Sequence, residues 1–304
     1  MLPSFPRVAS SSSLCFSVAY HQNVTNSYYL CNSLMILESL HRLGSKADGA
    51  MMYPKEWNVP ADNGMNATCK STILAQPRDR YDAELVPIQV PTFSHQEPTW
   101  KHSFTKLLAF NQTQYKRIIN LDSDSTVLQL MVTAYGMDEL FFLPSSPVAV
   151  PEPIGSLTSP ISLLPIARHP AFRARMAVHR ILHGNHSSSD FDMEIVNLYG
   201  NSCIMLPHSQ YNLITGEFRL ENHDAYLGSK EEQWNVTQVL EEAKFLHFSD
   251  WPYPKPWLKA SGAETVKNQP KCQAAGDGVE ACEERDTCRL SDVVTGNRRI
   301  CGNT

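Results

Sequence analysis

Two aspartates separated by one residue are the clearest candidates for chemistry in this sequence. Asp122, Ser123 and Asp124 follow the apolar run 118–121, whose length and β-branching favour a short buried strand. Carboxylates just beyond a strand lie at the edge where open α/β sheets bind ligands. Such a pair suits a hard divalent cation that shares its oxygen ligands with substrate phosphates. The alternative is a polar turn, since short motifs often occur without a function.

A second polar patch could complete such a site. His247 lies in the short strand expected over 245–248, and Lys255 follows within a Pro-Lys-Pro-Trp sequence. Imidazole beside two carboxylates gives a mixed oxygen and nitrogen ligand set, which favours manganese over magnesium. Flanking prolines hold Lys255 extended, and its ammonium group suits phosphate oxygens. A core histidine and a solvated lysine are the alternatives.

Other chemistries find less support. Asp190, Asp192 and Glu194 open an expected helix, where carboxylates favour the N-terminus, although they could also bind sugar hydroxyls. The sequence contains no Gly-x-Ser-x-Gly and no glycine-rich phosphate loop. Any phosphate must therefore be held by metal and lysine.

The elements that position these residues alternate between strand and helix over the first 130 residues. This alternation predicts an α/β fold with a mostly parallel sheet flanked by helices. Prolines over 143–166 favour short strands, and 55–74 is expected to be loop or broken helix. The remaining expectations are strands over 16–20, 50–53, 85–90, 118–121 and 202–206, and helices over 28–43, 104–110, 171–182 and 190–198.

The bulk composition is that of a globular chain, with 42% hydrophobic and 19% charged residues among 304. The net charge of −5 and dispersed basic residues argue against a nucleic-acid partner. No apolar stretch approaches the ~20 residues of a membrane span, so we expect a soluble chain without a membrane anchor. Three regions are predicted: a disordered leader (1–13), the main domain (14–258) and a cysteine-bearing extension (259–304).

The eight cysteines bear on the compartment. Half of them lie in the extension, at spacings unlike those of zinc sites, which favours disulfides and an oxidising environment. Asn-x-Ser/Thr triplets, such as Asn23-Val24-Thr25, agree with a glycoprotein.

Five stretches together resemble glycosyltransferase family 8, the glycogenin-like group, and within it the fungal branch of Golgi N-acetylglucosaminyltransferases, also called glucose N-acetyltransferases. The matching stretches are 28–44, 103–113, 121–129 with 138–141, 192–197 and 247–257. The resemblance implies a single GT-A-type, Rossmann-like domain in the Golgi lumen. It also implies a Mn²⁺-dependent, retaining transfer, with N-acetylglucosamine moving from a UDP-sugar to a mannose-containing glycan. A glycogenin-like glucosyltransferase and a catalytically impaired UDP-sugar-binding homologue are the alternatives.

The resemblance also assigns residues. Asp122, Asp124 and His247 match the metal ligands, and Asp192 matches a carboxylate that orients the donor sugar and acceptor. The predicted substrate contacts are Thr25, Tyr29, Lys106, Ser123, Thr158, Ser159 and Lys255. Breaking the anomeric bond leaves negative charge on UDP, which a cation and a lysine can stabilise.

The sequence departs from the family pattern in three places. Residues 131–137 lengthen the step after the metal turn and could disturb it, and Pro160 follows the pair Thr158 and Ser159 unexpectedly. The N-terminal membrane anchor of the fungal branch is absent from this chain.

Overall fold

The computed structural model describes residues 18–59, 68–91, 102–129 and 208–248, with gaps at 221 and 228–229, and the short pieces 148–149, 163–167, 204–205, 255 and 261–263. The predicted domain boundaries near 13 and 258 lie outside these residues, as do the expected helices over 171–182 and 190–198.

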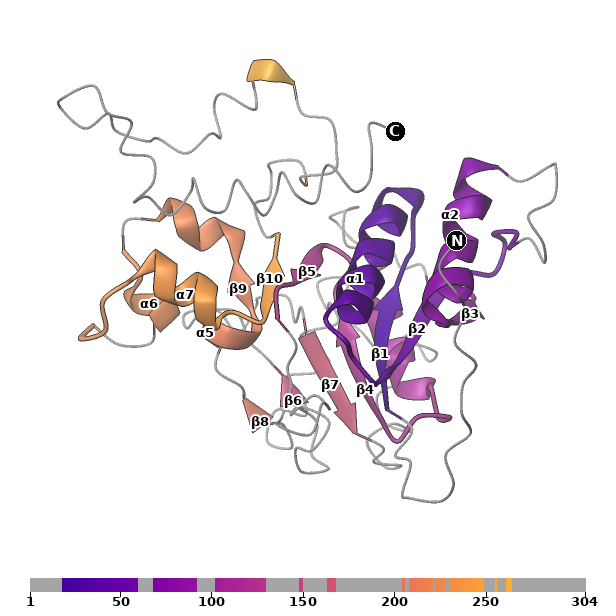
Figure 1. Ribbon diagram of the computed structural model, residues 1–304, viewed down its shortest axis with the longest axis horizontal. Helices are drawn as coiled ribbons and strands as arrows, with labels where there is room; N and C mark the ends of the chain where they lie inside the picture. The colour runs from indigo at the N-terminus through magenta and orange to yellow at the C-terminus, as the bar shows by residue number, and fades with distance from the viewer. Residues whose placement is uncertain are drawn as a thin grey trace.

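A five-stranded sheet forms the centre of the molecule, in the order β3-β2-β1-β4-β7 (Figure 1). Four strands are parallel and β7 runs antiparallel to β4, which confirms the predicted α/β fold. The chain passes from β1 outward to β3 and then returns to the other side of β1, so the order reverses between β1 and β4. The strands are β1 (Val18–Asn23), β2 (Asp48–Pro54), β3 (Glu84–Ile88), β4 (Arg117–Leu121) and β7 (Leu163–Ala167).

Helix α1 (Leu30–Arg42) follows β1 after the 3-10 turn η1 (Ser27–Tyr29) and covers one face of the sheet. Its Ile36 and Leu40 share a buried cluster with Tyr20 and Ile119, so the apolar stripe of the helix packs on β1 and β4. Gly44, at φ +84°, lies just beyond the helix end in a backbone conformation that glycine tolerates best. Because strand side chains alternate, His21 and Asn120 point to the opposite face.

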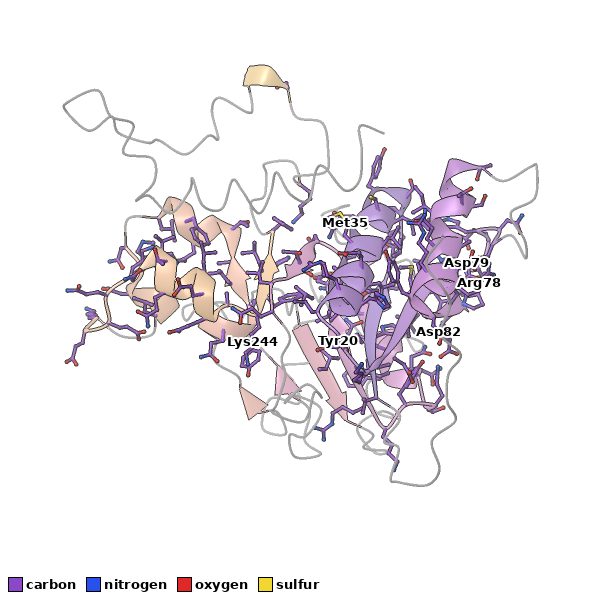
Figure 2. The ribbon with its side chains drawn as sticks, in the orientation of Figure 1. Tyr20, Met35, Arg78, Asp79, Asp82 and Lys244 are labelled. Carbon is purple, nitrogen blue, oxygen red and sulfur yellow. The ribbon has the colours of Figure 1, made fainter. Side chains whose placement is uncertain are left out.

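Helix α2 (Cys69–Tyr81) corrects the expectation of loop or broken helix over 55–74. Thr68 caps it, with its hydroxyl oxygen accepting the Ser71 N–H at 3.2 Å. Pro77 is a breaker signal in the sequence, yet it lies in the last turns of the helix. Arg78 and Asp79 lie near that end, and Asp82 ends the helix in left-handed backbone at φ 52° (Figure 2).

A second, smaller sheet lies beside the first, in the order β5-β10-β9. Strand β10 (Phe245–His247) runs antiparallel to β5 (Ser125–Val127) and parallel to β9 (Leu213–Ile214). Its neighbours are α5 (His208–Tyr211), η6 (Thr215–Arg219), α6 (Asp224–Leu227) and α7 (Val236–Glu242). Strands β6 (Val148–Ala149) and β8 (Ile204–Met205) form a third pair, as expected from the short-strand regions.

The 3-10 helix η3 (Ser103–Asn111) occupies the stretch where the sequence predicts a helix, and it delivers the chain to β4. Within the part of the chain that the structure describes, no helix combines the length and hydrophobicity that a membrane span needs.

Candidate functional site

The Asp122–Ser123–Asp124 turn begins directly after β4, at the carboxyl edge of the parallel strands. This edge is also where the strand order reverses, the place where α/β sheets bind ligands. Asp122 and Ser123 are buried, and the Asp124 side chain keeps partial access to solvent. The turn passes straight into β5, so its two ends are fixed by two different sheets.

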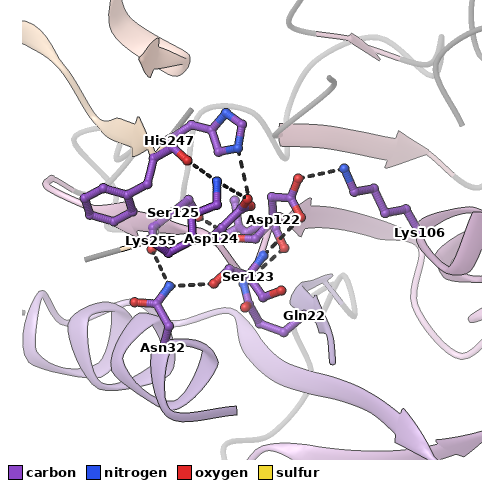
Figure 3. A network of polar contacts seen from close by, with 11 residues as sticks. Gln22, Asn32, Lys106, Asp122, Ser123, Asp124, Ser125, His247 and Lys255 are labelled. Carbon is purple, nitrogen blue, oxygen red and sulfur yellow. Dashed lines mark hydrogen bonds and ion pairs between the residues drawn. The ribbon is translucent and has the colours of Figure 1, made fainter. Parts of the chain in front are cut away.

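His247 reaches the turn through strand pairing. The antiparallel register of β10 and β5 places His247 opposite Ser125, the residue after Asp124. Nε2 of His247 lies 3.3 Å from Oδ1 of Asp124 (Figure 3). Asp122, Asp124 and His247 each offer one ligand atom, and these three atoms lie within 4.8 Å of one another. Two carboxylates and an imidazole are a ligand set that accepts a divalent cation such as Mn²⁺.

Two lysines flank the carboxylates on separate sides (Figure 3). Nζ of Lys106, from η3, lies 2.6 Å from Oδ2 of Asp122. Nζ of Lys255 lies 2.8 Å from Oδ2 of Asp124 and also donates to the carbonyl of Phe248. The site thus combines a candidate metal triad with two partly buried ammonium groups suited to phosphate oxygens.

No family model matches this chain. The glucose N-acetyltransferase 1 of Aspergillus fumigatus is 38% identical over 301 residues, covering 93% of this chain and 76% of the relative. The chain belongs to the glucose N-acetyltransferase 1 family of glycosyltransferases.

Two further comparisons bear on the extent and the fold of this family member. The glucose N-acetyltransferase 1 of Gibberella zeae is 45% identical over 296 residues, and the chain spans 62% of that relative's length. The structure of the galactosyltransferase LgtC, in complex with donor and acceptor sugar analogues, has a TM-score of 0.52 at 11% identity and covers 91% of this chain and 95% of that one. The match confirms the predicted GT-A-type fold.

The electrostatics of the site make Asp124 the more strongly ionised carboxylate of this glucose N-acetyltransferase 1 family member. Burial opposes its charge, but Lys255 and His247 outweigh burial and lower the pKa of Asp124 well below its usual value. Burial raises the pKa of Asp122, with help from Asp124, although Lys106 opposes the shift. Burial lowers the pKa of Lys255, but Asp124 more than compensates and the net pKa is raised.

Tyr29 and Thr25 lie in the connection between β1 and α1. Burial and then Asp124 raise the pKa of the Tyr29 phenol, and Lys255, Asp122 and Lys106 also act on it, which places its side chain beside the charged cluster. Thr25 precedes η1 and is half-buried. Tyr29 therefore lies near the carboxylate turn, and Thr25 lies four residues before it in the same connection, where the resemblance expects a uridine.

Three predicted site residues, Asp192, Thr158 and Ser159, lie outside the described residues, as do 131–137. Sequence reasoning missed two side-chain amides that contact the turn, Gln22 and Asn32. The available signal was a polar residue within the apolar face of an amphipathic helix, which Asn32 provides on α1.

Proposed function

We propose that this family member is a Mn²⁺-dependent, retaining glycosyltransferase that moves N-acetylglucosamine from a UDP-sugar to a mannose-containing glycan. The observation that carries the proposal is the convergence of Asp122, Asp124 and His247, whose ligand atoms lie within 4.8 Å of one another. The relatives in Gibberella zeae and Aspergillus fumigatus, both named glucose N-acetyltransferase 1, support the sugar class.

Each residue has a distinct role in the proposed reaction. Asp122, Asp124 and His247 would hold the cation, which acts as a Lewis acid on the diphosphate when bound. Lys255 and Lys106 turn from the carboxylates to the phosphate oxygens and stabilise the charge that develops on the leaving UDP. Thr25 and Tyr29 contact the uridine. Ser123, Thr158 and Ser159 contact the donor, and Asp192 orients the donor sugar and acceptor.

The proposed location is the lumen of the secretory pathway, as in the Golgi branch that the sequence resembles. Cys31 of α1 is disulfide-bonded, which supports an oxidising compartment. The expected disulfides of the 259–304 extension belong to the same proposal.

UDP release from a panel of UDP-sugars, with a mannoside acceptor and Mn²⁺, tests the function. We expect release to be greatest with UDP-N-acetylglucosamine and to stop when a chelator removes the metal. Nuclear magnetic resonance of the product should show the anomeric configuration of the donor. Absence of transfer from every UDP-sugar tested would overturn the proposal.

A matched pair of variants links the activity to the site. Asp122→Asn removes a proposed ligand charge, whereas Asp79→Asn changes an exposed aspartate on α2. Transfer should be lost in the first variant and kept in the second.

A further inference from the structure

Every backbone carbonyl from Leu121 to Ser125 accepts a hydrogen bond from a side chain or from a backbone N–H outside the turn's own strand. The Ser125 hydroxyl donates to the Asp122 carbonyl, and the Phe248 N–H donates to the Asp124 carbonyl at 2.9 Å. The other three carbonyls, those of Leu121, Ser123 and Ser125, accept from side-chain amides. The polypeptide around the two aspartates is therefore held along its whole length.

The amides come from the first strand and the first helix. Gln22 on β1 donates through Nε2 to the Leu121 carbonyl at 3.2 Å. Asn32 on α1 donates through Nδ2 to two carbonyls, at 2.5 Å to Ser123 and 2.9 Å to Ser125 (Figure 3). One amide nitrogen thus bridges the residues on both sides of Asp124.

The chemistry of these contacts fixes which side chain can make them. Both partners of Asn32 are carbonyl oxygens, so only a nitrogen or hydroxyl donor can face them. Asn32 is 1% exposed, and water cannot readily substitute for its amide. Its position on the buried face of α1, between Leu30 and Ile36, locks the amide against the turn.

The two hydrogen bonds of Asn32 bear most directly on the position of Asp124. Asn32 holds the peptide group that directly precedes Asp124 and the one that follows Ser125, while the Phe248 N–H holds the peptide group between them. The backbone on both sides of Asp124 is thereby fixed, and with it the direction of the carboxylate. That carboxylate is the group that meets both His247 at 3.3 Å and Lys255 at 2.8 Å. Rotation of the peptide group between Ser123 and Asp124, which Asn32 holds through the Ser123 carbonyl, would move the proposed ligand atom away from the imidazole.

From these contacts we infer that Asn32 is a positioning residue, which sets the metal-binding geometry of Asp124 through the carbonyls of Ser123 and Ser125. The inference rests on the proposed function, because it presumes that the carboxylates bind a cation. Tyr29 directly precedes α1 and lies beside the same charges, so one helix turn connects the proposed nucleotide and metal subsites.

Asn32→Ala removes both hydrogen bonds and tests the inference. We expect Mn²⁺ affinity, measured by electron paramagnetic resonance with saturating UDP, to weaken at least about tenfold, the lower end for residues that orient metal ligands. The transfer kcat should fall in parallel, while the KM for the acceptor stays within about twofold. Asn32→Ser keeps one donor and should give an intermediate loss if the alanine variant folds poorly.

Two controls separate positioning from general damage. Ser33→Ala changes the next residue of α1, whose buried hydroxyl has no hydrogen-bond partner among the residues that the structure describes, and should leave Mn²⁺ affinity unchanged. Leu37→Ala opens a cavity in the cluster with Met51 and Leu74 and should lower stability without weakening Mn²⁺ binding by folded protein.

Hydrogen–deuterium exchange provides a readout that needs neither metal nor activity. Peptides covering 122–127 should exchange faster in Asn32→Ala than in the parent, whereas peptides covering β2 should not change. Unchanged exchange at 122–127, or Mn²⁺ affinity within twofold of the parent, would overturn the positioning role. A parent protein that binds no Mn²⁺ would instead overturn the proposed function, and exchange would still decide the role of Asn32.

Discussion

Nζ of Lys255 lies 2.8 Å from Oδ2 of Asp124, so the lysine expected to bind a phosphate forms an ion pair with an expected metal ligand. Lys106 has the same relationship with Asp122, at 2.6 Å. Two ammonium groups thereby compensate the buried carboxylate of Asp122 and the partly buried carboxylate of Asp124. A cation held between the carboxylates would take over this compensation, and both lysines would then be available to the donor phosphates.

Replacing Lys255 with methionine should separate metal binding from phosphate binding. Loss of a charge-assisted contact, about 1.5–3 kcal/mol, should reduce kcat/KM for the UDP-sugar by roughly 10–100-fold. Mn²⁺ affinity without nucleotide should rise, because Lys255 no longer competes for Asp124. Calorimetry and steady-state kinetics give the two numbers, with the exposed Lys46→Met as control. A parallel fall of both affinities would contradict the competition.

Asp124→Asn should abolish the metal site while preserving the shape of the side chain. The amide carries no charge for a cation and cannot compensate Lys255, so Mn²⁺ binding and transfer should both fall by at least about 100-fold, more than outer-shell changes usually cause. Mn²⁺ titration and UDP release measure the two effects. Retention of metal-dependent transfer would remove Asp124 from the ligand set.

His21 should make the fold sensitive to mildly acidic pH. Burial lowers its pKa from 6.5 to about 4, opposed in part by the hydrogen bond to Asn120 and by Glu84. Between these values the unfolded chain binds a proton that the folded chain does not. Stability is therefore complete above pH 6.5 and declines as the pH falls toward 4, by about 2 kcal/mol at pH 5.

Urea unfolding of the parent and of His21→Gln at pH 7.5 and pH 5.0 measures this dependence. The glutamine cannot titrate, so the variant should lose less stability between the two conditions. Identical losses would show that other groups govern the acid sensitivity.

Gly44→Ala should destabilise the end of α1 through backbone strain alone. Gly44 has φ +84°, and an added Cβ would meet no atom of the described part of the chain within 4 Å. The expected cost is about 1–2 kcal/mol, the penalty of a left-handed backbone for a residue with Cβ. Gly44→Asn should cost less, because asparagine tolerates this region better. Chemical unfolding should rank the three proteins accordingly, and equal stabilities would refute the strain argument.

The parallel sheet could be predicted because its strands are short apolar runs that alternate with helices. The observed β1 extends to Asn23, beyond the expected end at residue 20, because His21, Gln22 and Asn23 are polar yet buried. Helix α2 was missed for a related reason: its apolar spacing is weak and Pro77 signals a break. Local sequence patterns thus predicted the strands that are buried because their residues are apolar. They did not predict the elements that are stabilised by helix caps and tertiary contacts.

The candidate site could be assembled from residue types together with the family resemblance, which alone supplied Lys106, but its geometry could not. Asp122, Asp124, His247 and both lysines were named from the sequence, and the structure brings these five side chains together. The register that places His247 opposite Ser125 depends on pairing between segments far apart in the chain. Nothing local specified that pairing, or the contact of Asn32 with the turn.

The pairing of β5 with β10 has a consequence for the evolution of this chain. The hydrogen bonds between these strands continue past β5, where the Leu128 N–H donates to the Lys244 carbonyl at 2.9 Å. The segment between Leu128 and Lys244 therefore begins and ends at neighbouring positions. Residues added to or deleted from this segment need not change the position of His247 relative to Asp124. A one-residue slip of the ladder itself would turn the imidazole to the other face. The segment between Leu128 and Lys244 can therefore change in length during evolution while the register of β5 with β10 stays the same.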